Sequence, residues 1–344
     1  MKVGFVYHPI YLEHDTGQHV ENAGRLLAII SHLERTGLRH QLTPIEPRSA
    51  SSQELSLVHD KQYLSHIQDM AQKGGGWLNA DTVMSADSYE VAAYAVGGVI
   101  TATEAVMNGE VGSAFALIRP PGHHATLKQA MGFCLFNDVA IAVKYAVNKY
   151  QLERVLIIDF DVHHGNGTQA VFYSNPQVLY ISTHQSPFYP GTGSIDETGS
   201  GIARGTTLNI PLPAGCGDAE YQSVFEQVIV PAARRFKPRL ILVSAGYDAH
   251  WADELAMMQV TITGFGQIVR IIKQIADELC NGHLVFSLEG GYNLTALAFS
   301  VKATFDVLLG NTEIEDPLGE SPRRFEAPDI DSLVKAVRGI HNLT

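Results

Sequence analysis

The sequence predicts an α/β fold with a central, mostly parallel sheet and helices on both of its faces. Short apolar runs rich in Val, Ile, Leu and Phe alternate along the chain with longer helical patterns. Such runs are typical of strands buried on both faces, and their alternation with helices indicates a parallel sheet. The 344 residues show no internal repeat and no break in composition, so we expect a single domain over residues 1–344.

Six segments are predicted to be strands and six to be helices. The strands are Lys2–Tyr7, Ala114–Ile118, Val155–Phe160, Val178–Ser182, Leu240–Ser244 and Leu284–Leu288. The helices are Val91–Met107, Asp138–Tyr150, Tyr221–Phe236, Phe265–Leu279, Leu294–Leu308 and Ile330–Ile340. Asn137 can cap the second helix, and Pro231 should kink or restart the third. The polar segment Glu313–Pro328 is expected to be a surface loop.

Composition limits which binding partners and which cellular compartment we expect for the protein. Hydrophobic residues make up 45% of the chain, and the net charge is −12. No basic run exceeds two residues, so we expect no direct contact with nucleic acid. The apolar runs are strand-sized, and the N-terminus lacks a small-residue cleavage site, so we expect neither a membrane span nor a signal peptide. The three scattered cysteines, Cys134, Cys216 and Cys280, favour a reducing cytoplasm. A homo-oligomer is left open.

Polar, glycine-flanked clusters follow five of the predicted strands. In chain order they read RPPGHH, DVHHGNG, THQSPFYPGTG, AGYDAHWADE and EGGYN. In open α/β sheets, ligands bind outside the carboxyl ends of the strands. The five clusters are therefore expected to converge on one edge of the sheet and to form the functional site there.

Asp161, His163 and Asp248 are candidate metal ligands. Asp161 and His163 are two residues apart at a strand end, where side chains at i and i+2 share a face. Alone, that pair is better explained as a cap on the next helix. Asp248 at a second strand end favours a metal site instead. Two carboxylates and an imidazole can hold a divalent cation and leave coordination positions open for water and substrate. Zn²⁺ fits, and so do Fe²⁺, Co²⁺ and Mn²⁺.

Two histidines and a tyrosine are candidate catalytic groups. His123 and His124 follow the stiff turn Pro120–Gly122, and imidazole titrates near neutral pH, as a general acid or base must. In isolation, such a pair is more often a surface feature. Tyr292 follows two glycines, and its phenol can donate a hydrogen bond to a developing oxyanion. The alternative is an ordinary half-buried loop tyrosine.

Together these motifs resemble those of the histone deacetylase family, which includes acetylpolyamine amidohydrolases and acetoin-utilisation proteins. The resemblance rests on RPPGHHA, GFCLFNDVAIA, DFDVHHGNGTQ, STHQSPFYPGTG, LVSAGYDAH and LEGGYN. GQHVENAGRL is similar to the family's GHPExPxRL, with Val20 and Ala23 where prolines are usual. The similarity spans about residues 3–310 and leaves 311–344 as a C-terminal loop and helix. It implies a single-domain arginase/deacetylase fold.

The resemblance also assigns roles. By its motifs, Asp161, His163 and Asp248 hold one Zn²⁺, and a metal-activated water attacks an N-acetyl carbonyl. His123 and His124 are the paired catalytic histidines, and Tyr292 is the transition-state phenol. Asp159 orients His123, while Asn166 stands where some branches have Asp and accepts a hydrogen bond from His124. This amide is typical of the class II branch, and it should make His124 less readily protonated. His164 is not needed as a ligand and is expected to be structural.

Further residues are carried over from the family in the same way. The walls and mouth of a narrow acyl-lysine channel match Gly132, Phe133, Tyr189 and Leu255. A pocket for released acetate matches Arg25 and Cys134. An inner potassium site matches Asp159, Asp161, His163, Ser182 and Thr183, and an outer one matches Phe172, Asn175 and Val178.

The substrate stays open at this point between acetyl-lysine in a protein and an acetylated polyamine. In the family, a glutamate at the position of Leu255 would favour polyamines. Here Glu254 is the neighbouring residue, so a preference for polyamines stays open. An arginase-like ureohydrolase would need a second metal and a further carboxylate, but Asn166 stands in DFDVHHGN and supplies none. An inactive module that binds acetylated tails is the remaining alternative, and the filled ligand and catalytic positions argue against it.

Overall fold

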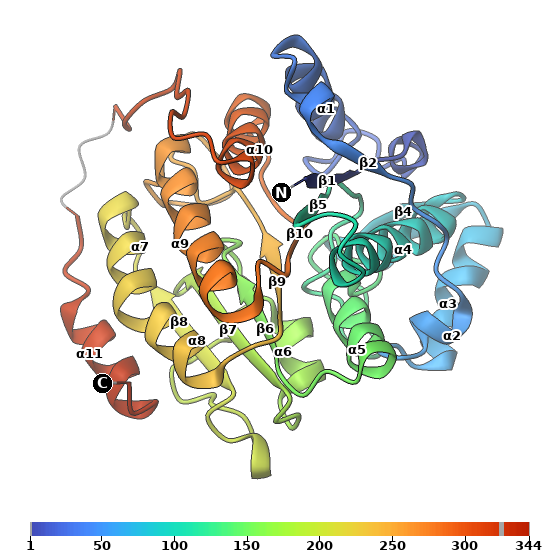
Figure 1. The fold of residues 1–344 in the computed structure, drawn as a ribbon. Coiled ribbons are helices and arrows are strands. Elements are labelled where there is room, and N and C mark those ends of the chain that lie inside the picture. The colour runs from blue at the N-terminus through green and yellow to red at the C-terminus, as the bar shows by residue number, and fades with distance from the viewer. Residues whose placement is uncertain (1, 323–326, 344) are drawn as a thin grey trace.

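The computed structural model describes residues 2–322 and 327–343, and its centre is an eight-stranded sheet (Figure 1). The strand order is β2-β1-β5-β10-β9-β6-β7-β8, and every neighbouring pair is parallel. The strands are β1 Val3–Val6, β2 Thr43–Ile45, β5 Ser113–Ala116, β6 Val155–Asp159, β7 Val178–Gln185, β8 Thr207–Leu212, β9 Leu240–Ala245 and β10 Leu284–Leu288. A small antiparallel pair, β3 Gly75–Trp77 and β4 Val83–Ser85, lies apart from it.

Two groups of helices cover the sheet. The helices are α1 Gly24–Arg35, α2 Ser52–Leu55, α3 Lys61–Gln72, α4 Ser88–Met107, α5 Asp138–Tyr150, α6 Asn166–Phe172, α7 Asp218–Val224, α8 Val230–Phe236, α9 Ile262–Cys280, α10 Leu294–Leu309 and α11 Asp331–Ile340. α10 packs against α1 and α9, whereas α4 packs against α5. Both α4 and α10 contact β1, and both α5 and α9 contact β9, so the two groups lie on opposite faces (Figure 1).

The predicted strands and helices are confirmed, with corrections at the edges. β2 and β8 were not predicted, because both are outermost strands and both contain proline, which weakens a strand pattern and is tolerated at a sheet edge. β7 continues three residues beyond the predicted end at Ser182, to Gln185. Helices α1, α2, α3 and α6 and the short strands β3 and β4 were also not predicted.

The segment predicted as one helix over Tyr221–Phe236 is interrupted as Pro231 led us to expect. It consists of α7, a π turn over Phe225–Ile229, and α8, whose first turn contains Pro231. Proline fits there because the amide N–H it lacks would be unpaired in a first turn. The described parts of Glu313–Pro328 form neither helix nor strand, and residues 323–326 lie outside the described residues.

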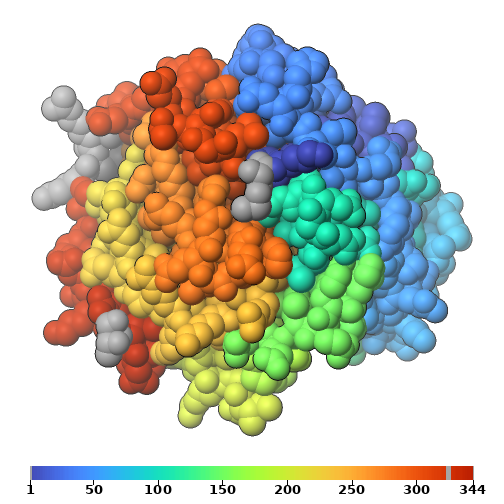
Figure 2. All heavy atoms as spheres, viewed as in Figure 1, coloured from blue at the N-terminus to red at the C-terminus, as the bar shows by residue number. Residues whose placement is uncertain are grey.

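The C-terminal helix α11 returns to the body of the protein. It contacts β8 and the π turn, and the space-filling view shows the red C-terminal segment lying against the yellow segment of α7 and α8 (Figure 2). Val334 and Val337 supply the buried side of α11. Sequence positions more than 100 residues apart are thereby brought together at the edge of the sheet.

α4 is a long, apolar helix of the core. Among the described residues it alone is long and apolar enough to cross a membrane, but 72% of that window is buried inside the fold. It packs against α5, β5 and β1, as a central helix of an α/β core does. Gly97 and Gly98 permit this close packing: a Cβ at Gly97 would overlap the Arg48 carbonyl oxygen, and one at Gly98 would crowd the Tyr11 hydroxyl.

This packing predicts opposite effects for the same substitution in two helices. Gly97→Ala should destabilise the protein by about 1–3 kcal/mol, because the added methyl group has no space against backbone. The control, Gly339→Ala in exposed α11, meets nothing within 4 Å and should stabilise by up to about 1 kcal/mol through helix propensity. Urea unfolding of both variants measures this. A Gly97→Ala variant as stable as the parent would contradict the close contact.

Candidate active site

The five strands followed by polar clusters are neighbours in the sheet. They are β5, β10, β9, β6 and β7, in that spatial order, and they occupy its centre. Because all run in the same direction, their carboxyl ends meet at one edge. The convergence predicted from the sequence is therefore confirmed, and it brings together residues as far apart in the chain as His123 and Tyr292.

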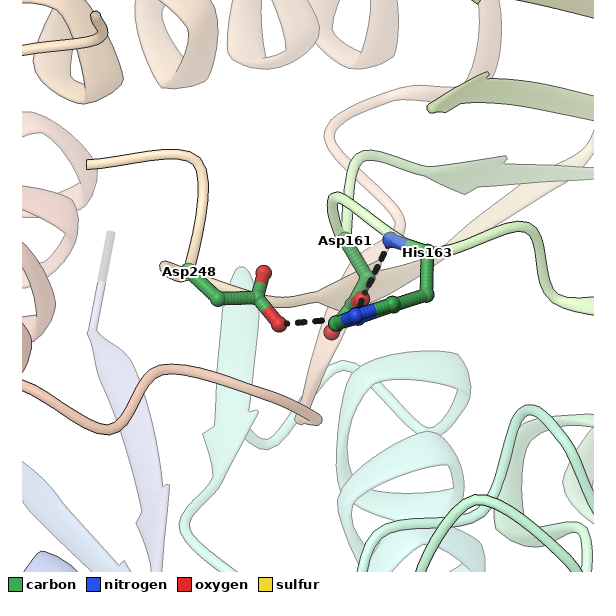
Figure 3. Close-up of side chains that lie close together, drawn as sticks. All are labelled: Asp161, His163 and Asp248. Carbon is green, nitrogen blue, oxygen red and sulfur yellow. Dashed lines mark hydrogen bonds and ion pairs between the residues drawn. The ribbon is translucent and has the colours of Figure 1, made fainter. Parts of the chain in front are cut away.

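Asp161, His163 and Asp248 form a compact group at that edge (Figure 3). One potential ligand atom from each lies within 4.8 Å of those of the other two. The Nδ1 atom of His163 is 3.1 Å from Asp161 Oδ1 and 3.2 Å from Asp248 Oδ2. Asp161 and His163 follow β6, and Asp248 follows β9, the strand paired with it.

Backbone groups orient both carboxylates. Asp161 Oδ2 accepts a hydrogen bond from the Gly290 N–H at 2.8 Å, and Asp248 Oδ1 accepts one from the Val162 N–H at 3.0 Å. A Cβ at Gly290 would overlap Asp248, so this position needs glycine. The Oδ2 atom of Asp248 is fully buried, and among the described residues it has no hydrogen-bond donor apart from the His163 imidazole. A buried carboxylate oxygen facing another carboxylate and an imidazole is what a cation site requires, so these residues fit a divalent metal.

The pKa values in this group show how strongly it favours positive charge. Burial opposes a charge on His163, yet its hydrogen bonds to Asp161 and Asp248 raise its pKa to about 10. Burial and the neighbouring charge of Asp161 raise the pKa of Asp248 to about 6. Without a metal, a proton on the imidazole must neutralise part of the carboxylate charge. A divalent cation would replace that proton and leave His163 neutral, as a ligand must be.

His123 and His124 lie side by side next to this group. Their ring centroids are 4.0 Å apart. His123 Nδ1 is 3.1 Å from Asp159 Oδ2, and His124 Nδ1 is 2.8 Å from Asn166 Oδ1. The Nε2 atom of His123 lies 3.8 Å from Asp161 Oδ1. The structure therefore brings together the two pairs that sequence reasoning proposed.

The two imidazoles differ in charge because their partners differ. Burial opposes a charge on His123, but Asp159 and Asp161 overcome this and hold its pKa well above the usual range. Burial lowers the pKa of His124, and the nearby His123 and His163 lower it further, while the neutral Asn166 amide compensates only in part. Near pH 7 one imidazole of the pair is charged and the other is neutral.

A narrow cavity of about 240 Å³ leads to these groups. Its lining includes all four predicted channel residues, Gly132, Phe133, Tyr189 and Leu255, and also Phe188, Pro121 and Asp81, which were not predicted. Phe188 stacks on His163 with 5.3 Å between ring centroids. The walls are thus mainly aromatic, and they suit a slender apolar chain.

Tyr292 reaches the same cavity from the loop after β10. Its backbone N–H donates to Asp253 Oδ2 at 2.6 Å, and its ring lies 5.8 Å from that of Phe133. The Arg25 guanidinium is 4.9 Å from the centre of the ring. Burial raises the pKa of the phenol well above its usual value, so the hydroxyl stays protonated and can donate a hydrogen bond.

Arg25 and Cys134 are both fully buried. Arg25 donates to the carbonyl oxygens of Gly291 at 2.7 Å and Glu289 at 2.5 Å, and it pairs with Glu21. The Cys134 thiol contacts the Gly132 carbonyl oxygen at 3.2 Å. Neither residue lines the channel cavity, so their part in an acetate pocket stays a prediction.

The residues predicted to bind potassium lie at the ends of β6 and β7. Asp159 and Ser182 are paired in register, and Asp159 Oδ1 and Thr183 Oγ1 are buried without a hydrogen-bond partner. In the outer group, the Asn175 N–H donates to the Phe172 carbonyl oxygen, and the Val178 N–H to that of Asn175. These placements are compatible with cation sites and do not test them.

His164 turns away from the metal-ligand group, as expected. Its ring is buried, with Nδ1 2.7 Å from Thr192 Oγ1 and Nε2 2.9 Å from Gln169 Oε1. Sequence reasoning missed Tyr180, whose hydroxyl donates to Asp159 Oδ2 at 3.0 Å, and Glu289, which accepts the Gly122 N–H at 2.7 Å. Glu289 could have been found, since it opens the EGGYN cluster at a strand end, whereas nothing marked Tyr180.

The fold and the site define an α/β protein with a candidate metal-ligand group at one end of a narrow cavity. Comparison with known proteins gives the family. The sequence model of the histone deacetylase domain matches residues 19–308. The chain belongs to the histone deacetylase family, and it is a hydrolase of the kind that acts on acetyl amides.

Relatives come from plants, archaea and bacteria. The chain is 41% identical to "Histone deacetylase 14, chloroplastic" of Arabidopsis thaliana over 96% of its length and 83% of that protein. It is 41% identical to "Probable deacetylase" of Archaeoglobus fulgidus, over 86% of this chain and 82% of the other. It is 38% identical to "Histone deacetylase-like amidohydrolase" of Pseudomonas aeruginosa, over 87% of this chain and 80% of the other.

A solved structure supports the fold directly. The crystal structure of the HDA15 HD domain matches with a TM-score of 0.87 and 33% identity, over 99% of this chain and 94% of that one. The predicted arginase/deacetylase fold is thereby confirmed.

The metal content of two variants distinguishes the roles of the adjacent histidines after β6. His163→Ala should abolish stoichiometric metal binding, because it removes one of three ligands. The matched control, His164→Ala, loses two buried hydrogen bonds and about 1–3 kcal/mol of stability but should keep its metal. Elemental analysis of both purified variants measures this. Equal metal content in the two would exclude His163 as a ligand.

Proposed function

We propose that the protein is a zinc-dependent deacetylase that acts on acetylated lysine side chains. The observation that carries this proposal is one cavity that ends at the metal-ligand group, at the unequal histidine pair and at Tyr292. The donor set of two carboxylates and one imidazole suits Zn²⁺. Such an ion, when bound, supplies Lewis-acid polarisation of the acetyl carbonyl and makes a water molecule more acidic.

The protein's own residues would divide the remaining work. His124, neutral near pH 7, is suited to take the proton of the attacking water. His123, held in its charged form by Asp159, is suited to stabilise negative charge and to supply a proton to the departing amine. Tyr292 would donate a hydrogen bond to the acetyl oxygen as that atom gains charge.

The channel lining favours an acetyl-lysine chain over an acetylated polyamine. A polyamine carries further ammonium groups, which need carboxylates along the channel. Besides the proposed ligand Asp161, Asp81 is the only carboxylate among the described lining residues. Its Oδ1 atom already accepts hydrogen bonds from the Gly132 N–H and the Thr82 hydroxyl. A butyl chain between Phe133, Phe188 and Tyr189 needs no such partner.

We also propose that the ends of β6 and β7 bind K⁺. The support is that Asp159 Oδ1 and Thr183 Oγ1 are buried without partners, which a hard cation would supply. We place the activity in a reducing, cytoplasmic compartment, since the three cysteines are buried and unpaired.

A substrate panel tests the main proposal. The protein loaded with zinc should hydrolyse an acetyl-lysine peptide faster than acetylputrescine or acetylspermidine, and chelator should stop the reaction. Tyr292→Phe should lower kcat by about 100- to 1000-fold with metal content unchanged, because one oxyanion donor is lost.

Three results would count against these roles. Undiminished turnover with chelator would exclude the metal, near-normal turnover by Tyr292→Phe would exclude the phenol, and a preference for the acetylpolyamines would overturn the substrate. Running the peptide assay in potassium and in sodium buffer tests the second cation: equal activity and stability in both would remove it.

The partner of His124 predicts a shift in pH dependence. Asn166→Asp puts a carboxylate in place of the amide 2.8 Å from Nδ1, so it should raise the pKa of His124. A base with a higher pKa is protonated at higher pH. The acid limb of the kcat/KM profile should therefore move to higher pH, by about one unit. An unchanged limb, with the variant folded and loaded with metal, would show that His124 is not the base.

A further inference from the structure

A second cavity lies at the amino ends of the strands, on the opposite side of the sheet from the active site at their carboxyl ends. Its volume is about 800 Å³. Arg154, which lines it, directly precedes β6, and Thr206 directly precedes β8, whereas the proposed metal ligands follow the strands. The five residues of β6 separate the two edges by roughly 16 Å at 3.3 Å per residue. The cavity is therefore distinct from the acyl channel.

Three arginines from separate parts of the chain line this cavity. Arg154 comes from the start of β6, Arg204 from the loop between β7 and β8, and Arg235 from the last turn of α8. One carboxylate, the exposed Asp196, accompanies them. In a chain with a net charge of −12, three guanidinium groups around one cavity form a locally positive site.

None of these guanidinium groups is neutralised within the described residues. No carboxylate oxygen of that part of the chain lies within 4.0 Å of them, although other arginines of the protein, such as Arg234, do have ion pairs. Arg154 Nε donates to the Lys237 carbonyl oxygen at 2.9 Å, and Arg235 donates to that of His341. The Arg204 side chain makes no hydrogen bond to any described residue. Most of their donors remain available for a ligand.

His341 provides an independent sign of a missing ligand. It lines the same cavity just after α11, with 4% of its surface exposed. Neither ring nitrogen has a well-formed hydrogen bond within the described residues, although the Gly205 backbone is near enough to influence the ring. Burial and then Arg235 lower its pKa to about 4, so it presents a neutral imidazole with one N–H donor. A buried polar ring without partners is costly unless an occupant satisfies it.

We propose that this cavity, the arginine site, binds the phosphate groups of a small molecule. Guanidinium donors match phosphate oxygens in pairs, and three of them around one space suit a ligand with two phosphate groups better than a single carboxylate. Thr198, Thr206 and Asn342 add neutral polar groups to the lining, while Phe236 and Ile340 give it apolar walls. Organic diphosphates and free pyrophosphate share the recognised chemistry.

The dipole of α8 offers a simpler explanation for part of the cluster. Cations in the last turn of a helix are favoured by its partial negative charge, and this accounts for Arg234 and Arg235. It does not account for Arg204, which is on no α-helix and contacts no carboxylate in the described chain. Arg204 is thus the residue whose presence most specifically indicates a ligand.

Calorimetric titration of the full chain tests the arginine site. Pyrophosphate and ADP serve as probes, at low and at moderate salt. We expect saturable binding that weakens at least about tenfold in Arg204→Gln, because charge-assisted hydrogen bonds are lost. The matched control is Arg234→Gln, which removes one arginine from the same surface but outside the cavity. Its affinity should equal that of the parent chain.

The outcomes separate the possible sources of phosphate. Tighter binding of ADP than of pyrophosphate would support an organic diphosphate that also uses the apolar walls, and equal affinities would support recognition of the phosphate groups alone. Undiminished binding by Arg204→Gln overturns the proposal. Coordination of pyrophosphate by the active-site metal would give that result. The absence of saturable binding also overturns the proposal, and so does binding of a single-stranded oligonucleotide without binding of either small probe.

Discussion

The active-site edge of the sheet depends on how buried negative charge is stabilised there. Asp159, Asp161, Asp248 and Glu289 are all buried where β6, β9 and β10 end. Removing an unpaired carboxylate from water costs several kcal/mol, so each must find donors or a cation. Backbone N–H groups, the Ser244 hydroxyl and two imidazoles supply part of the need. Asp248 Oδ2 has no donor among the described residues other than the His163 imidazole, so it marks the part of the need that these groups do not meet.

This requirement explains several sequence features that look unrelated. Gly246, Gly290 and Gly165 stand where a Cβ would overlap a carboxylate oxygen of Asp161, Asp248 or Asp159, so glycine makes room for the charges. Burial raises the pKa of Glu289 to about 7, yet it accepts hydrogen bonds from the Gly122 and His123 N–H groups. It thereby ties the loop that carries the histidine pair to the end of β10. The charge requirement and the catalytic geometry are met by the same contacts.

Much of this could be predicted from the sequence because it depends on local pattern. Buried parallel strands are continuous apolar runs, and the clusters after them were recognisable before their convergence was known. Edge strands β2 and β8 escaped notice because each lacks a paired strand on one side, so proline is tolerated there. Tyr180 and Phe188 escaped because their roles arise from contacts between strands and loops, which carry no spacing signal. The arginine site escaped for the same reason, since its members are up to 188 residues apart, from Arg154 to Asn342.

The parallel sheet gives its two edges opposite electrostatic character. Helices that follow strands begin near the strands' carboxyl ends and finish near the amino ends, so partial positive charge of helix dipoles faces one edge and partial negative charge the other. The clustered carboxylates lie at the first edge and the three arginines at the second. At the first edge, the dipoles are too weak to stabilise several buried charges, since each dipole interaction is worth about 0.3–1 kcal/mol. This agrees with the metal that we propose there. At the second edge the arginines are more exposed, so the same arrangement can persist in water and still retain donors for an anion. The dipoles thus favour carboxylates at one end of the strands and arginines at the other, and these side chains would in turn attract the proposed cation and the proposed phosphate groups.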